Sequence, residues 1–146
     1  VTGSKLGESP MNDEGLQEFG GRYTAAWCSQ DAARVAAFFT EGGSLTINGG
    51  APAAGRAAIA ASAQGFMTAF PDLVVSMNSI DVEHDIVLYR WTLTGTHTGP
   101  GGTGSAVRIS GYEEWAFGAD GLIAESKGHF DEAEYNRQLK VGAAGR

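Results

Sequence analysis

The fold of this chain is decided by residues 85–131, which read DIVLYRWTLTGTHTGPGGTGSAVRISGYEEWAFGADGLIAESKGHFD. Three runs rich in Val, Ile, Thr, Tyr and Trp are separated by glycine-rich turns at 99–104 and 118–121. β-Branched and aromatic runs divided in this way are typical of antiparallel strands joined by short turns. Because the runs alternate, one face of the sheet is expected to be buried. The stretch therefore predicts a meander whose buried face the rest of the chain covers.

The preceding residues predict three helices. The first opens at Ser9-Pro10, with proline at its first position and one apolar stripe made of Leu16, Phe19, Tyr23 and Trp27. The pair Gly20-Gly21 interrupts this helix and indicates close packing against a neighbour. The second begins at Asp31, buries Phe38 and Phe39, and ends at residues 41–43. The third covers residues 56–70 and is ended by Pro71.

Strands at 44–48 and 73–82 and a closing helix from Asp131 complete the predicted order of elements. Helices and strands segregate, which predicts the α+β class. A strongly curved sheet wrapped over the three N-terminal helices, with a short C-terminal helix, would form a cone with a pocket at its wide end. We expect one domain over residues 11–140, between a flexible N-terminal tail at 1–10 and a C-terminal tail at 141–146.

Composition excludes several classes of partner. The net charge of −7 and the lack of any Lys/Arg cluster argue against a nucleic acid. A single cysteine excludes an internal disulfide. No apolar run approaches the roughly 20 residues that span a bilayer, so we expect no membrane partner and a soluble, cytoplasmic protein. The three histidines lack the spacing of metal ligands, and no metal site is expected.

Several short motifs, in this order, resemble a known family. The segment RYTAAWCSQD at 22–31, followed by residues 34–39 and Gly55-Arg56, is similar to the first half of the nuclear transport factor 2-like superfamily. The second half resembles the SnoaL-like polyketide cyclase branch through Arg90-Trp91, GTHTG at 95–99, Gly121-Leu-Ile, Asp131 and Gln138-Leu139. The resemblance covers roughly residues 11–140.

The resemblance implies a cone-shaped α+β barrel with a mixed, mostly antiparallel sheet. It also implies an apolar pocket for an apolar small-molecule ligand, a homodimer formed through the outer face of the sheet, and no metal or organic cofactor. Relatives include cyclases, ketosteroid isomerases, dehydratases, limonene epoxide hydrolases and non-catalytic binders. The fold is therefore specified more closely than the reaction.

Glu113 is the first candidate for catalysis. The resemblance aligns it with the pocket carboxylic acid of ketosteroid isomerase-like relatives and turns Ser126, Gly128 and Phe130 inward on the last strand. A carboxyl among Trp91, Trp115 and Phe130 would be costly to ionise, so its pKa would rise and it could donate a proton at neutral pH. The alternatives are a solvated glutamate or an ion pair with Arg108 or Arg90.

His97 and Tyr23 are the other two catalytic candidates. In its GTHTG setting His97 resembles the pocket histidine of SnoaL-like cyclases, and an imidazole can take or give a proton near neutrality. The alternative is a histidine at the end of a strand, hydrogen-bonded to the loop at 99–104. Tyr23 aligns with the oxyanion-hole tyrosine of some relatives and could join Glu113 in donating to a substrate carbonyl oxygen. The alternative is a core tyrosine.

The substrate-binding candidates are one amide and six aromatic residues. Asn48 resembles the asparagine that helps to hold water in limonene epoxide hydrolase-like relatives, although a turn asparagine before Gly-Gly explains it as well. Strand alternation turns Tyr89 and Trp91 inward together with Val87, Leu93 and His97. The predicted aromatic lining, which could instead be core, is Trp27, Phe66, Tyr89, Trp91, Trp115 and Phe130.

Two departures from the relatives limit the choice of reaction. No acid occurs at 44–50, where ketosteroid isomerase-like enzymes carry a base, and Arg90 has no aspartate nearby in sequence for epoxide hydrolase-like chemistry. The prediction is therefore a small enzyme without a cofactor, in which Tyr23 and Glu113 polarise an oxygen and His97 moves the proton. A non-catalytic ligand-binding module and a dimeric interaction protein are the alternatives.

Overall fold

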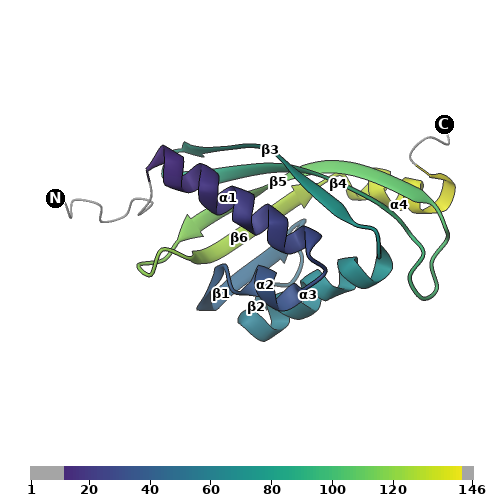
Figure 1. Cartoon of the computed structure of the whole chain (residues 1–146), viewed down its shortest axis with the longest axis horizontal. Coiled ribbons are helices and arrows are strands. Elements are labelled where there is room, and N and C mark those ends of the chain that lie inside the picture. The colour runs from purple at the N-terminus through teal and green to yellow at the C-terminus, as the bar shows by residue number, and fades with distance from the viewer. Residues whose placement is uncertain (1–11, 143–146) are drawn as a thin grey trace.

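One open sheet of six strands organises residues 12–142, the part of the chain described by this computed structural model (Figure 1). The strand order is β2-β1-β6-β5-β4-β3. The strands are β1 (Phe39–Ile47), β2 (Ala53–Ala54), β3 (Val74–Glu83), β4 (Ile86–Thr96), β5 (Ala106–Phe117) and β6 (Ile123–Phe130). All neighbours are antiparallel except β1 and β6, which run parallel. The predicted meander is confirmed as β4-β5-β6.

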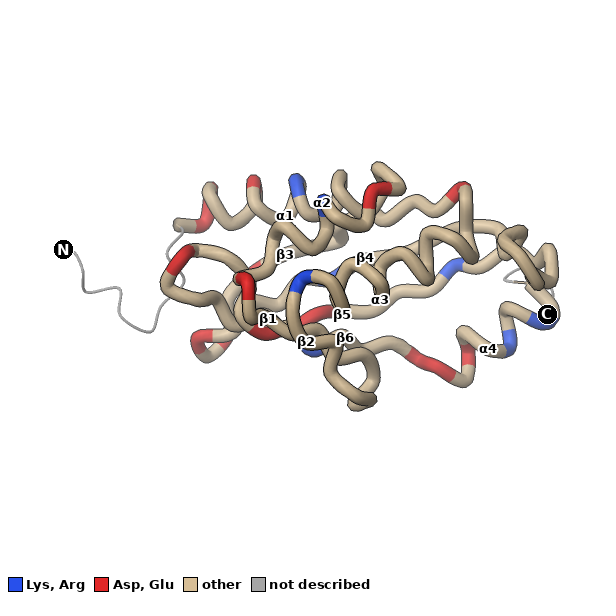
Figure 2. The backbone as a smooth tube through the Cα atoms, turned by 90° about the horizontal axis from the view of Figure 1, so that it is seen from below, with Lys and Arg blue, Asp and Glu red and all other residues tan. Residues whose placement is uncertain are grey.

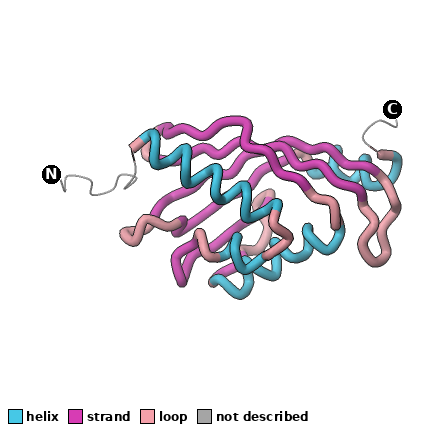
Figure 3. Tube along the Cα trace, viewed as in Figure 1, coloured by secondary structure: helices cyan, strands magenta, loops and turns pink. Residues whose placement is uncertain are grey.

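Four helices accompany the sheet in the described residues: α1 (Asp13–Cys28), α2 (Ala32–Ala36), α3 (Arg56–Ala69) and α4 (Glu132–Val141). Figure 3 shows α1 lying across the sheet, with α2 and α3 below it and α4 at the far end of the strands. Three of the four helices begin at a side-chain cap, because Asn12, Asp31 and Asp131 accept hydrogen bonds from the first turns of α1, α2 and α4. None of these helices is long and apolar enough to cross a membrane.

The concave face of the sheet and the inner faces of the helices form one core. The predicted stripe of α1 is buried there, and Tyr23 makes edge contacts with Tyr89 and Trp115 at centroid distances of 5.3 and 5.1 Å. Alternation on β5 and β6 buries Trp115 and Ser126 and leaves Tyr112 on the opposite, outer face. Figure 2 shows the lysines and arginines scattered along the described chain.

Several predicted boundaries are wrong. The second helix ends at Ala36, and β1 begins at Phe39, so Phe39 is a strand residue. Residues 41–43 are an irregularity within β1, where the register against β6 shifts between Phe39 and Ser44. A Cβ at Gly43 would lie 2.9 Å from the carbonyl oxygen of Ile123, so this glycine permits a close approach between strands. The glycines that were expected to end a helix therefore serve a bulge.

Further corrections concern the edges of the fold. The sheet is not closed, because β2 and β3 are free edges, so the cone is not a complete barrel. The short strand β2 lies between the strand predicted at 44–48 and the helix predicted at 56–70, where no strand was expected, and α4 continues to Val141, within the tail predicted at 141–146. The helix opening predicted at Ser9-Pro10, the tail predicted at 1–10 and residues 143–146 of the tail predicted at 141–146 lie outside the described residues; Asn12 caps α1.

Candidate active site

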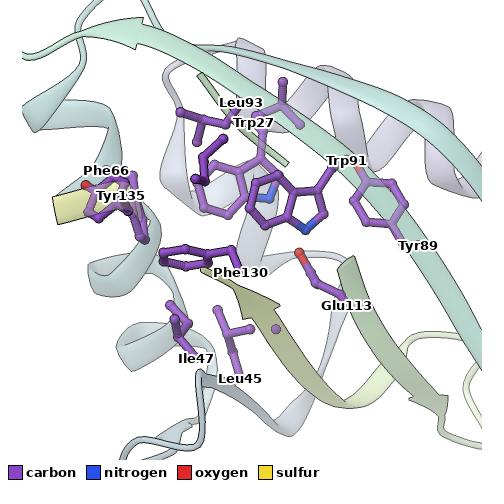
Figure 4. A pocket seen from close by; sticks show the side chains of 13 residues that line it. Trp27, Leu45, Ile47, Phe66, Tyr89, Trp91, Leu93, Glu113, Phe130 and Tyr135 are labelled. Atoms are coloured by element: carbon purple, nitrogen blue, oxygen red, sulfur yellow. The ribbon is translucent and has the colours of Figure 1, made fainter. Parts of the chain in front are cut away.

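A cavity of about 70 Å³ opens between the concave face of the sheet and three helices, α1, α3 and α4 (Figure 4). Its walls carry aliphatic side chains from β1, β3, β4 and β5 and one glycine, Gly128. The single carboxyl group in the walls belongs to Glu113. The aromatic part of the lining consists of Trp27, Phe66, Tyr89, Trp91, Phe130 and Tyr135. The chamber is therefore apolar apart from one acid and a few ring heteroatoms.

Three donors converge on the carboxyl group of Glu113. The indole Nε1 of Trp115 and the hydroxyl of Ser126 each donate to Oε1 at 2.7 Å. The hydroxyl of Tyr23 lies 3.1 Å from both carboxyl oxygens and donates between them. Among the described residues Glu113 makes no ion pair, so the predicted alternative of a partner at Arg108 or Arg90 is wrong. Arg90 instead lies beside Asp81, at 3.1 Å, on the outer face.

The pKa of Glu113 is set by opposing influences. Burial raises it, because Glu113 is only 8% exposed and an ionised carboxyl loses its hydration there. The hydrogen bonds from Trp115, Ser126 and Tyr23 lower it, because each favours the negative form. Burial is the largest influence, and the pKa lies above the ordinary value for glutamate. The group is thus suited to hold a proton that an exposed carboxyl would lose.

Strand register creates this cluster. Glu113 and Trp115 are two residues apart on β5 and therefore share one face of the sheet. Ser126 of β6 lies opposite Trp115, so all three side chains face the same way. Gly128 lies opposite Glu113 and lacks a side chain, which leaves the cavity open above the carboxyl group. The fourth member, Tyr23, comes from α1, 90 residues earlier in the chain.

Tyr23 reaches Glu113 but not the cavity. Its side chain is fully buried, and it is not among the lining residues. Burial raises the pKa of its hydroxyl well above the ordinary value, and the charge of Glu113 raises it further. The two groups therefore do not form a pair of donors aimed side by side at a ligand. Tyr23 acts on a ligand only through Glu113.

His97 lies away from Glu113, at the other end of β4. Its Nδ1 accepts the backbone N–H of Thr103 at 3.1 Å, and its ring packs 5.4 Å from that of Phe70. The hydroxyl of Thr103 in turn donates to the carbonyl of Leu139 in α4. His97 is therefore hydrogen-bonded to the loop at 99–104, as the alternative interpretation predicted, and it does not line the cavity. The link from this loop to the C-terminal helix is made by Thr103.

The other predicted residues divide into two groups. Five of the six aromatic candidates line the cavity, but Trp115 is fully buried behind Glu113. Asn48 does not line it either: its Oδ1 accepts the N–H of Phe130 at 2.9 Å, and its φ of 52° marks a turn. Tyr135, which was not predicted, lines the cavity from α4. Its place one turn after the Asp131 cap was the signal that could have found it.

No cluster of three or more potential metal ligands occurs in the described part of the chain. The feature of this geometry that can do chemistry is one carboxyl group with a raised pKa, held by three donors at the edge of an aromatic chamber.

The sequence model of the SnoaL-like polyketide cyclase family matches residues 17–139. The chain belongs to this family. No curated protein matches the chain. The family assignment agrees with the resemblance seen in the sequence. The matched residues include both Tyr23 and Glu113.

Several solved structures share the fold of this chain. TsrD from Streptomyces laurentii is 20% identical with a TM-score of 0.75, over 88% of this chain and 97% of TsrD. A protein of ketosteroid isomerase-like fold from Catenulispora acidiphila, in complex with trimethylamine, is 15% identical with a TM-score of 0.73, over 84% and 92% of the two chains. SalBIII, an epoxide hydrolase/cyclase-like enzyme in pyran ring formation in the polyether salinomycin, is 19% identical with a TM-score of 0.71, over 85% and 97%. These likenesses establish the NTF2-like cone fold.

Proposed function

We propose that this protein is an enzyme that transfers protons to and from a small, largely apolar molecule, with Glu113 as its general acid and base. The observation that carries the proposal is the buried carboxyl group in the cavity wall, held by three donors and unaccompanied by a cation in the described residues. A carboxyl whose pKa is raised above the ordinary value by burial is better suited to giving a proton than an exposed one, and the three donors stabilise the carboxylate that takes the proton back.

The proton transfers form a closed cycle. Neutral Glu113 gives its proton to an oxygen of the ligand as that oxygen gains negative charge, for example when a C–O bond of a strained ring breaks. The resulting carboxylate is stabilised by Trp115, Ser126 and Tyr23. The carboxylate then takes a proton from a hydroxyl group of the same ligand, as the oxygen of that hydroxyl group forms a new C–O bond to the carbon that lost its oxygen. SalBIII, an epoxide hydrolase/cyclase-like enzyme that shares this fold, has a role in pyran ring formation.

The proposal differs from the sequence-based hypothesis in its roles. Tyr23 becomes a positioning residue, because its hydroxyl donates to Glu113 and has no access to the cavity. His97 has no role in the proposed proton transfer, because its side chain does not line the cavity and lies against the loop at 99–104 instead. Glu113 alone therefore acts first as acid and then as base.

The test compares the rates at which Glu113→Gln and Glu114→Gln convert a panel of small hydroxy-epoxides. Formation of the cyclic ether product is the quantity measured. Glutamine keeps the size of Glu113 but has no proton to give, so kcat/KM should fall about 10²–10⁴-fold. Glu114 is the matched control, because it adjoins Glu113 in sequence but faces outward and contacts His129 at 2.9 Å. Its variant should retain the wild-type rate. Wild-type turnover by Glu113→Gln would remove Glu113 from the chemistry.

A second candidate function is a module that binds an apolar ligand without converting it. The observation in its favour is the lining itself, in which six aromatic side chains surround a single ionisable carboxyl group. This function predicts ligand binding without product by the wild type, with affinity retained in Glu113→Gln but reduced in Trp91→Ala. Turnover by the wild type that depends on Glu113 rejects it.

A further inference from the structure

One donor in the wall of the cavity has no acceptor. The indole Nε1 of Trp91 is buried and forms no hydrogen bond with any described residue. The same side chain lines the cavity beside Glu113. Leaving a buried donor unpaired costs about 1–3 kcal/mol, and native proteins keep few such groups. By contrast, the indole of Trp115 is paired with Glu113. The unpaired N–H of Trp91 therefore calls for a partner that the chain itself does not provide.

Strand register directs this N–H toward Glu113. Trp91 lies opposite Gly111 on β5, and the neighbouring inward pair is Tyr89 with Glu113, so Trp91 and Glu113 are diagonal neighbours on one face. A Cβ at Gly111 would lie 2.7 Å from Cζ2 of Trp91. Nε1 and Cζ2 belong to the same long edge of the indole, and that edge rests along β5. Figure 4 shows the indole nitrogen on the side of the ring that faces the carboxyl group.

The two oxygens of Glu113 are not equivalent. Oε1 accepts from both Trp115 and Ser126 at 2.7 Å, and Tyr23 also lies within reach of it. Oε2 has Tyr23 as its one donor in the described residues. An oxygen that already accepts two strong hydrogen bonds is a poor place for a proton, so the proton of neutral Glu113 resides on Oε2. The carboxyl group then presents an O–H donor close to the N–H of Trp91.

We propose that Nε1 of Trp91 and the protonated carboxyl of Glu113 together bind one oxygen atom of the ligand. This inference rests on the proposed function of Glu113 as an acid. An oxygen with two lone pairs, such as that of a ketone, an epoxide or a cyclic ether, accepts both hydrogen bonds at once. Trp91 is then a catalytic residue as well as a wall, because its N–H stabilises the negative charge that develops on the oxygen.

The pair also defines the class of substrate. The molecule is neutral, carries an oxygen acceptor at the end that enters beside β5, and is otherwise apolar enough for the aromatic walls. An alkylammonium ion offers no acceptor and leaves the N–H of Trp91 unpaired. It would be held by cation–π contacts with the aromatic faces and by the ionised form of Glu113. The two ligand classes therefore make opposite demands on Trp91.

The test uses cyclohexanone as the probe and methylcyclohexane as its counterpart without oxygen. Replacing Trp91 by 3-benzothienylalanine exchanges the N–H for sulfur and keeps the shape of the ring, and Trp91→Phe is a second, encodable variant. Each should bind cyclohexanone about three- to tenfold more weakly, the loss expected for one hydrogen bond. In the benzothienyl variant, binding of methylcyclohexane should not change. The indole proton of Trp91 should move downfield when cyclohexanone binds to the wild type, and it should move further than that of Trp115, which already donates to Glu113.

Three results would overturn the inference. They are an unshifted Trp91 indole proton with equal cyclohexanone affinity in wild type and variants, tighter binding of tetramethylammonium than of cyclohexanone, and no binding of cyclohexanone at all. These results are independent of the Glu113→Gln rate measurement. If Glu113→Gln is inactive and the Trp91 variants bind cyclohexanone as the wild type does, Glu113 remains the general acid and Trp91 does not bind the ligand oxygen. If cyclohexanone engages Trp91 but Glu113→Gln retains full activity, the proposed function falls, and with it the pairing of Trp91 with an acid.

Discussion

Glu113 combines strong desolvation with three stabilising donors in one side chain. Without the donors, burial alone would fix the group in its neutral form, and it could not act as a base after giving its proton. Without burial, it would be ionised at neutral pH and could not act as an acid. The donors and the burial therefore have to be balanced for a single carboxyl group to serve both steps.

Ser126→Ala tests this balance. Loss of a donor at 2.7 Å removes stabilisation of the ionised form, so the pKa of Glu113 should rise, as it should in Tyr23→Phe. In ¹³C spectra the titration of the Glu113 carboxyl carbon should move to higher pH, and the basic limb of the rate profile should move the same way. Ser110→Ala is the control, because that hydroxyl contacts Thr92 on the outer face. A titration that stays in place or moves to lower pH in Ser126→Ala would contradict the account.

Alternation explains which pocket residues could be predicted from sequence. Tyr89 and Trp91 lie within a regular strand, where every second side chain faces the same side, whereas the inward direction of Glu113 was taken from the family resemblance. His97 lies one residue beyond the end of β4 at Thr96, so the alternation that assigned it no longer applies. The role of the Tyr23 hydroxyl could not be predicted, because a helical stripe says which face is buried but not which residue 90 positions later accepts the hydrogen bond.

At the scale of an element, α1 shows how adjacent glycines can serve different purposes. A Cβ at Gly20 would lie 2.7 Å from Sδ of Met77 and 2.9 Å from Cδ1 of Ile80, both on β3. A Cβ at Gly21 would have no neighbour within 4 Å. The close packing predicted from this pair is therefore present at Gly20 alone. Gly20 allows α1 to approach the sheet, and Gly21 lies on the exposed side of the helix.

The two alanine variants should consequently separate in stability. Both gain helix propensity, which for Gly21→Ala should raise the free energy of unfolding by about 1 kcal/mol. Gly20→Ala carries the same gain but pushes against the ends of the Met77 and Ile80 side chains, so it should be less stable than Gly21→Ala by about 1 kcal/mol. Urea unfolding at one pH measures both. Equal stability of the two variants would mean that α1 can move away from the sheet without loss.

The sequence also defined some elements better than others for a physical reason. The meander and α3 were predicted because in both the residue types and the flanking turn residues indicate the same secondary structure. The start of β1 was missed because Gly42 and Gly43 have the composition of a helix end, whereas Gly43 lies in close contact with β6. A parallel partner so far along the chain leaves no local signal.

At the scale of the whole molecule, the sheet has one covered and one open face. The helices contact side chains of the concave face, as Tyr23 does with Tyr89 and Tyr135 with Phe130. The outer face carries Tyr112, which is 40% exposed and stacks on His129 at 4.7 Å. We propose that a second copy of the chain covers this face, as the family resemblance implied, with the aromatic stack near its centre.

Light scattering during size exclusion measures this assembly directly. The wild type should have about twice the 15.2 kDa of one chain at micromolar concentrations. Tyr112→Glu places a charge in the proposed interface and should yield monomers, whereas Gln64→Glu changes the charge equally on the exposed side of α3 and should stay dimeric. A wild-type protein that elutes as a monomer throughout this range would exclude the dimer.

The parallel pairing of β1 with β6 bears on the order in which the molecule can fold. Leu45 pairs with Ser126, and Tyr23 bonds to Glu113, so the cluster joins segments from opposite ends of the chain. Such non-local pairing forms slowly, because a long loop has to close, at a cost in entropy, before the contacts between the paired strands stabilise it. During synthesis the first helix and β1 wait for β6 to emerge. Glu113 therefore spends the early life of each molecule as an ordinary hydrated carboxylate and becomes a buried acid only when the last strand is in place.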